Sequence, residues 1–167
     1  MGCRAKKYAT WSRILSVIIM LVILWIPVKA MQNDSIPFVG TGTRSDPYLI
    51  SSVDDLLLFA NEVNAGKHFD GNYFRQTGNI DLNEIDWTPI GEFGSESSFC
   101  GVYDGNGYWI ENLTVESENN AGFFGQLGGT VMNLGIESGF LSGPCMGAIT
   151  SHSSQSSAII INCYSKA

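Results

Sequence analysis

The sequence predicts a mainly β fold in which short parallel strands stack as coils, a parallel β-helix, with one N-terminal α-helix. Three observations favour this fold. The chain of 167 residues contains 19 Gly and only 15% charged residues, which is typical of a chain with many turns and excludes a coiled coil. A single segment has convincing helical periodicity. An asparagine-centred motif then recurs at Asn112, Asn133 and Asn162, and such spacing is typical of stacked repeats.

The first thirty residues have the pattern of a secretory signal peptide. Residues 4–13 are basic, residues 14–28 form an apolar run broken only by Ser16, and Val28-Lys29-Ala30 offers a cleavage site. An uncleaved anchor is the alternative, but the run is shorter than the ~20 residues of a spanning helix. In either case we expect the remainder to be exported, secreted or on the cell surface, and to meet a membrane only through this segment.

The exported part is strongly acidic. From residue 31 onward it has four Lys or Arg residues against all 16 acidic residues, a formal net charge of −12. Such a surface repels phosphate backbones, so nucleic acid is not expected as a partner.

Residues 31–39 are interpreted as a linker, and residues 40–110 as an N-terminal cap that holds the helix and the first strands. The helix is expected over 53–65, because Ser52 and Asp55 fit a capping box and Gly66 a helix stop. Its predicted apolar face comprises Val53, Leu56, Leu57, Ala60 and Val63. Short strands or apolar pieces are expected at 47–50, 72–76, 79–82, 87–91, 99–103 and 108–110.

Residues 111–167 are predicted to form the repeats. The segments 110–115, 131–136 and 160–165 each carry an asparagine at the third position. We expect these asparagines to stack as a ladder of side-chain amides, with apolar neighbours stacked beside them and an insertion within 147–157. Chance similarity of short strands is the alternative. The predicted ladder is Asn112, Asn133 and Asn162, and the neighbours are Leu113, Leu134 and Cys163.

These motifs, in this order, resemble those of the GLUG-motif repeat proteins from Gly40 to the last residue. The matching pieces are residues 40–50, Phe74–Leu82, Trp87-Thr-Pro-Ile-Gly91, Phe99–Gly107, Ile110–Thr114, Gly122-Phe-Phe-Gly125, Asn133-Leu-Gly135 and Asn162-Cys-Tyr-Ser165. The resemblance implies a right-handed parallel β-helix of an exported bacterial surface protein, with no established catalytic residue. Because the family normally continues for further repeats, it also implies that this chain is truncated or the first piece of a longer protein.

Similar repeats also sit beside the protease domain of IgA-protease-type metallopeptidases. The zinc signature His-Glu-x-x-His of those enzymes is absent from this sequence.

Few groups suit catalysis or metal binding. His68 and His152 have no ligand spacing to a cysteine, so no zinc site is expected. Cys145 and His152 lack a third group that would orient them as a nucleophile pair. Cys100, Cys145 and Cys163 are interpreted as small buried apolar residues; if a disulfide forms, we expect it between Cys145 and Cys163.

Two acidic motifs allow a functional interpretation. Asp81, Glu84 and Asp86 could supply the paired carboxylates of a polysaccharide-active enzyme, although in so acidic a chain we interpret them as a solvated face. The turn Asp104-Gly-Asn-Gly resembles the opening of a calcium loop, but Val115 stands where that loop needs an acid. We therefore interpret it as a hairpin turn.

Aromatic residues offer a further binding signal. Trp87, Tyr103, Tyr108 and Trp109 could stack on sugars or peptides, but we expect these rings to fill the junction between the helix and the coils. At least one of the neighbouring rings at 123 and 124 should point inward.

No catalytic, cofactor-binding or metal-binding residue is assigned, and the ligand-binding residues are unknown. The leading hypothesis is a non-enzymatic, exported surface module for adhesion, display or binding of host glycans or proteins. The alternative is an accessory domain of a polysaccharide-active or protease surface enzyme. With so few coils, residues 31–167 are expected to be only marginally stable.

Overall fold

The computed structural model describes residues 37–92, 94, 96–153 and 158–167. The predicted signal peptide and most of the predicted linker lie outside this part, as do the last four residues, 154–157, of the predicted insertion. Phe38–Ala167 forms one compact unit. No helix within the described ranges is both long and apolar enough to span a membrane.

The predicted helix is confirmed as α2, Val53–Asn64, one residue shorter than expected. The Ser52 hydroxyl accepts a hydrogen bond from the Asp55 amide at 3.2 Å and donates one to Asp55 Oδ2 at 3.0 Å. Ser52 is therefore the N-cap as predicted, and Asp55 Oδ2 reaches back to the Ser51 amide at 2.9 Å where a standard capping box would bind the Ser52 amide. The buried residues of the helix are Leu56, Phe59, Ala60 and Val63, whereas Val53 and Leu57 are half-buried.

The described part is mainly β with this one helix. Its thirteen strands are two to four residues long. They are β1 (Tyr48–Ile50), β2 (Tyr73–Gln76), β3 (Ile80–Asp81), β4 (Val102–Asp104), β5 (Trp109–Glu111), β6 (Leu113–Glu116), β7 (Asn120–Ala121), β8 (Thr130–Met132), β9 (Gly135–Ile136), β10 (Gly139–Ser142), β11 (Cys145–Met146), β12 (Ile159–Ile161) and β13 (Tyr164–Ser165).

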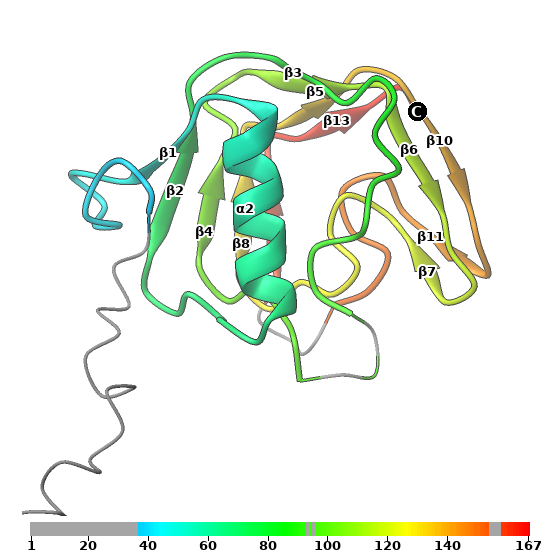
Figure 1. Ribbon diagram of the computed structural model, residues 1–167, viewed down its shortest axis with the longest axis horizontal. Helices are drawn as coiled ribbons and strands as arrows, with labels where there is room; N and C mark the ends of the chain where they lie inside the picture. Colours follow the sequence, from blue (N-terminus) through cyan, green and yellow to red (C-terminus); the bar gives the residue numbers. More distant parts are fainter. Residues whose placement is uncertain (1–36, 93, 95, 154–157) are drawn as a thin grey trace, which may run out of the picture. The chain divides into compact units, whose positions relative to one another are not determined.

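All pairings between these strands are parallel, and they build four open sheets. The orders are β1-β2-β4-β8-β12, β3-β5-β9-β13, β6-β10 and β7-β11. From β4 onward the chain passes through the four sheets in turn and returns to each one four strands later (Figure 1). We call one such circuit a coil. In the five-stranded sheet, Phe74, Tyr103, Val131 and Ile160 share one position on successive strands, each one coil after the last.

The ladder prediction is right for Asn133 and Asn162 and wrong for Asn112. Asn162 Nδ2 donates to Asn133 Oδ1 at 2.9 Å, and Asn133 Nδ2 donates to Asp104 Oδ1 at 2.9 Å. We call these three residues the first ladder. Asn112 belongs to a second ladder, because its Nδ2 donates to Asp81 Oδ1 at 2.7 Å and its backbone amide donates to Ser138 Oγ at 2.9 Å.

The error has a physical cause. The step from Asn112 to Asn133 is shorter than one coil and joins two different corners, whereas the step from Asn133 to Asn162 returns to the same corner. Both corners need a residue with positive φ, and φ is 58° at Asn112, 52° at Asn133 and 51° at Asn162. Asparagine tolerates this conformation, so the two corners look alike in sequence. The predicted stacking of Leu113 on Leu134 is wrong for the same reason, since Leu113 pairs with Gly139.

The core is aromatic and lies between the sheets and α2. The centroid of the Phe59 ring on the helix lies 4.4 Å from that of the Phe74 ring and 5.1 Å from that of the Phe99 ring. Phe59 also stacks on Tyr103, with ring centroids 5.7 Å apart. Phe124 also meets Phe59, at 6.5 Å. Through these ring contacts, the helix covers one end of the hydrophobic core.

The aromatic prediction is confirmed for Tyr103, which is buried and stacks on Phe59 of the helix. Trp87 is also buried, but among the coils, while Tyr108 and Trp109 are half-buried. Trp87 stacks on Phe123 with ring centroids 5.3 Å apart, and its indole N–H donates to the Phe123 carbonyl at 3.0 Å. Phe123 and the next residue are both fully buried.

The turn at Asp104 is not a hairpin. It is a corner, because β4 and β5 belong to different sheets. The Asp104 carboxylate accepts hydrogen bonds from the Asn106 amide, from Asn133 Nδ2 and from Arg75 Nε. These oxygen atoms therefore hold the corner together.

The edge of β1 is covered by the segment before it. The Leu49 amide donates to the Val39 carbonyl at 2.9 Å, and the centroids of the Phe38 and Phe74 rings lie 5.4 Å apart. Phe38 falls in the predicted linker but is buried.

Candidate functional site

The acidic cluster does not form an enclosed site. Asp81, Glu84 and Asp86 are all exposed. Asp81 Oδ1 accepts from the Asn83 amide at 2.9 Å as well as from Asn112, so this carboxylate stabilises a corner. None of the three lines either of the two hollows described below.

Cys100, Cys145 and Cys163 are all free, so the Cys145–Cys163 pairing considered as the alternative does not form. Cys145 lies on β11 in register with Asn120, whereas Cys163 lies between β12 and β13 and donates to the Ile161 carbonyl at 3.3 Å. Cys145 is also exposed, so its interpretation as a buried apolar residue is wrong. Partial burial raises the pKa of the Cys163 thiol, which disfavours its reactive thiolate.

The histidines do not belong to a cluster of metal ligands among the described residues. His68 is exposed, and its Nδ1 lies 3.0 Å from the Ser98 carbonyl oxygen. Across the described ranges, no group of three or more His, Cys, Asp or Glu residues could hold a metal ion.

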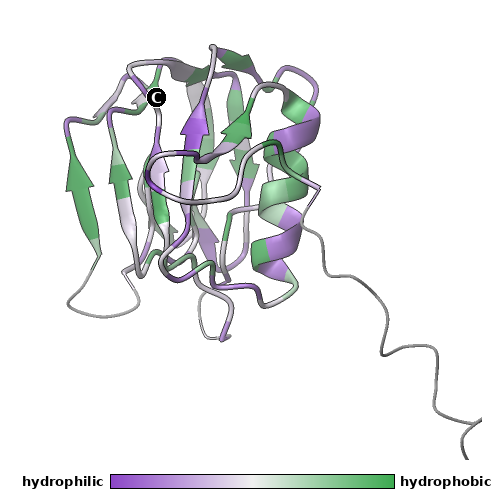
Figure 2. Cartoon of the chain, turned by 90° about the vertical axis from the view of Figure 1, so that its left-hand side faces the viewer, coloured by the Kyte–Doolittle hydropathy of each residue, from purple (hydrophilic) through white to green (hydrophobic). Residues whose placement is uncertain are grey.

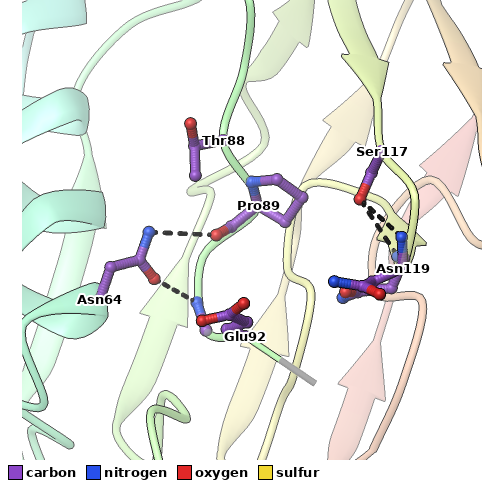
Figure 3. Close-up of a pocket in the computed structure, with 8 residues that line it drawn as sticks. Asn64, Thr88, Pro89, Glu92, Ser117 and Asn119 are labelled. Carbon is purple, nitrogen blue, oxygen red and sulfur yellow. Dashed lines mark hydrogen bonds between the residues drawn. The ribbon is translucent and has the colours of Figure 1, made fainter. Parts of the chain in front are cut away.

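One hollow, of about 260 Å³, lies between the segment 88–92 and the segment 117–120 (Figure 3). Asn64 at the end of α2 spans its wall, with Nδ2 donating to the Pro89 carbonyl at 3.2 Å and Oδ1 accepting from the Gly91 amide at 2.7 Å. Ser117 Oγ accepts from the amide of Asn119 at 3.2 Å. The side chains of Asn64 and Ser117 thus already bind the chain itself, so we assign this hollow a structural role.

The other hollow, of about 300 Å³, lies on the outward face of the five-stranded sheet. We call it the arginine hollow. Register places Arg75 on β2 beside Asp104 on β4, and Tyr73 beside Val102. Because alternate residues of a strand face opposite sides, these side chains point away from the core that Phe74 enters. The side chains that line this hollow include Arg44, Tyr73, Arg75, Asp104, Thr130 and Met132.

The arginine hollow concentrates the scarce positive charge. Arg44 and Arg75 are the only arginines from residue 31 onward, and both line it. Arg75 meets Asp104 through Nε at 3.3 Å, which leaves its two terminal amino groups outside the ion pair. Arg44 is exposed and has no ion-pair partner among the described residues. The hollow can therefore offer guanidinium donors to an anion.

Sequence reasoning missed this site. The two arginines lie far apart in the sequence, and only the pairing of β1 with β2 brings their segments together. Their rarity in an acidic chain was the one available signal.

No family model matches the chain. It is 34% identical over 116 residues to halomucin of Haloquadratum walsbyi, a match that covers 62% of this chain and 1% of halomucin. It is 32% identical over 130 residues to a protein provisionally described as a Gly-rich membrane protein of Evansella cellulosilytica, covering 74% of this chain and 15% of that protein.

Among solved structures, the fold resembles a chain from Bacteroides ovatus provisionally described as an immunoglobulin A1 protease. The TM-score is 0.61 at 26% identity, over 75% of this chain and 39% of that chain. This chain is thus similar to segments of three longer proteins and spans less than half of each.

Proposed function

We propose that this chain is an exported, non-catalytic surface module, a right-handed parallel β-helix of the GLUG-motif type, and that it binds acidic glycans. The parallel register that returns to the same position in each coil supports the architecture. The signal-peptide pattern and the likeness to a membrane protein support export to the surface.

The observation that carries glycan binding is the arginine hollow. A guanidinium group binds a carboxylate through paired, charge-assisted hydrogen bonds. Tyr73 adds a half-buried ring against which a sugar can pack. The hollow is shallow and lies on a repeating sheet face, which suits a polymer that binds through many weak contacts. The ligand class is therefore a glycan with carboxylate-bearing sugars.

A glycan array of the exported protein tests this proposal. Carboxylate-bearing polymers should bind, and their neutral counterparts should not. Arg44→Ala should weaken binding at least tenfold, because a hydrogen bond to a charged group contributes about 1.5–3 kcal/mol. Lys67→Ala removes the same charge at a position that does not line the hollow, and should leave binding unchanged.

Binding that is equal for charged and neutral glycans, or that survives Arg44→Ala, would contradict the proposed ligand class. The alternative, an accessory domain of a surface enzyme, is favoured by the likeness to the chain described as a protease. Cleavage of any polysaccharide or protein by the purified chain would establish catalysis and exclude a purely binding role.

A further inference from the structure

The arginine hollow has a charged part and an apolar part. Its outward side chains form two rows across β2, β4 and β8, which are Tyr73, Val102 and Thr130 in one row and Arg75, Asp104 and Met132 in the other. Figure 2 faces this sheet and shows β2 as mainly hydrophilic and β8 as mainly hydrophobic. Arg75 and Met132 are two strands apart, which is about 10 Å, and one substituted sugar residue can bridge that span.

The charge of the hollow suits a single carboxylate. Two guanidinium groups and the Asp104 carboxylate line it, which gives a formal net charge of +1. Asp104 Oδ1 accepts from the Asn106 amide and from Asn133 Nδ2, both at 2.9 Å, and Oδ2 accepts from Arg75 Nε at 3.3 Å. Asp104 is therefore fixed in place, and a second anionic group on the ligand would meet its negative charge. We expect one carboxylate in each occupied hollow and no densely sulfated chain.

The rest of the lining is apolar, apart from two hydroxyl groups. Val102 and Met132 are half-buried and offer no strong hydrogen-bonding group, whereas Tyr73 and Thr130 supply the hydroxyls. A sugar hydroxyl turned toward Val102 or Met132 would lose water without gaining a partner, which is unfavourable. A methyl group there would bury apolar surface instead, and a methionine side chain adapts its shape to such a group.

The size of the hollow limits what it can hold. Its volume of about 300 Å³ is at the lower end of the range of small-ligand pockets. It therefore suits one sugar residue with a small substituent, while the rest of a polymer stays outside.

We infer that the sugar bound in the arginine hollow carries an acetyl group as well as its carboxylate. The inference rests on the proposed function and names the class of sugar more closely. The carboxylate binds the guanidinium groups of Arg44 and Arg75, and the acetyl methyl group lies on Val102 and Met132. The acetyl carbonyl accepts a hydrogen bond from the Thr130 hydroxyl.

NMR titration of the full chain, recovered after export, tests this inference with a matched pair of sugars. The methyl glycosides of N-acetylneuraminic acid and of ketodeoxynonulosonic acid each have one carboxylate, and the acetamido group of the first is a hydroxyl in the second. We expect the acetylated sugar to bind about threefold tighter or more, because a buried methyl group contributes about that factor. Saturation transfer from the protein should be strongest at the acetyl methyl protons.

A second pair tests an acetyl ester. It consists of O-acetylated alginate and the same polymer after mild alkali has removed the esters. Tighter binding of the acetylated member in either pair supports the inference, and the pair that shows it tells whether the acetyl group is an amide or an ester.

Variants of Met132 locate the acetyl contact. Met132→Gln keeps the length of the side chain but makes it polar, and should bring the affinity for the acetylated probe down to that for its partner. Met132→Leu is apolar again and should restore most of the preference. Met146→Gln is the matched control, because Met146 is exposed and does not line the hollow, and it should keep the full preference. Circular dichroism verifies the fold, and Val102→Thr, which replaces a methyl group with a hydroxyl, provides the result if Met132→Gln does not fold.

Equal binding within both pairs, still weakened by Arg44→Ala, overturns this inference and leaves the proposed function standing. A preference that survives both Met132→Gln and Val102→Thr also overturns it, because the acetyl group then binds elsewhere. If no carboxylate-bearing probe binds, the proposed function fails and the inference fails with it.

Discussion

At the scale of single residues, glycines let successive coils approach closely. A Cβ atom on Gly129 would lie 2.1 Å from the carbonyl oxygen of Gly101 in the preceding coil. That atom belongs to the backbone and cannot swing aside. Gly78, by contrast, has no neighbour within 4 Å of such a Cβ and does not have a positive φ.

We therefore expect Gly129→Ala to lower the free energy of unfolding by about 1–3 kcal/mol, as overpacking does. Gly78→Ala is the control and should change it by less than about 0.5 kcal/mol. Urea denaturation followed by circular dichroism measures both. Equal stability of the two variants would show that the coils can separate at Gly129 without cost.

Asn133 of the first ladder affects stability in two ways, through its side-chain hydrogen bonds and through its tolerance of a positive φ, and two variants can separate them. Asn133→Gly keeps the positive φ but removes the side-chain hydrogen bonds to Asp104 and Asn162, at about 0.5–1.5 kcal/mol each. Asn133→Ala removes the same bonds and adds about 1–2 kcal/mol for the left-handed backbone. Chemical denaturation should rank the wild type above Asn133→Gly and Asn133→Ala last. A glycine variant as stable as the wild type would mean that the ladder contributes nothing.

At the scale of elements, Phe59 gives α2 its aromatic contacts with the coils. Phe59 contacts rings from several coils, including Phe74, Tyr103 and Phe124. Phe59→Ala should lower the free energy of unfolding by about 3–5 kcal/mol, the usual cost of deleting a buried aromatic ring. Leu58→Ala on the same helix is the control, since Leu58 is only half-buried, and should cost clearly less. Thermal and urea unfolding measure the stability of both variants. Equal loss of stability in the two would show that the Phe59 ring contributes no more than a half-buried leucine.

The helix was predictable because its signals are local. The twelve residues of α2 follow the helical period, and the N-cap Ser52 binds Asp55 only three positions later. Phe59 still escaped the predicted apolar face, because that face was drawn to include Val53 and Leu57. The buried stripe runs instead through Leu56, Phe59, Ala60 and Val63. The strands were harder to delimit, since two to four residues show too little alternation to fix a boundary.

Pairing between strands could not be derived in the same way. Strands that pair are separated by a whole coil of sequence, and two different corners share the same asparagine chemistry. The mainly β fold with its one helix was predicted, but the stacking partner of Asn112 was not. The arginine hollow was missed for a related reason, because its charged groups come from separate segments that only the register unites.

At the scale of the whole molecule, we expect marginal stability. The five-stranded sheet has one strand from each coil, and its core is open at Ile160. Monomeric chain at low concentration should melt near or below the low end of the ~45–65 °C range of mesophilic domains. A sharp, high and concentration-independent melting of a monomer by circular dichroism would refute this expectation.

The parallel order of the strands also determines how the molecule responds to tension. Each inner strand of the five-stranded sheet, β2, β4 or β8, pairs only with the strand before it and the strand after it in the order of the sheet. A pull on the last residues loads these short ladders one at a time, so the coils should peel in succession from β13 and β12 while Phe59 still anchors the first ones. For a module on a cell surface, such stepwise unwinding would absorb force over a long extension instead of failing in a single break.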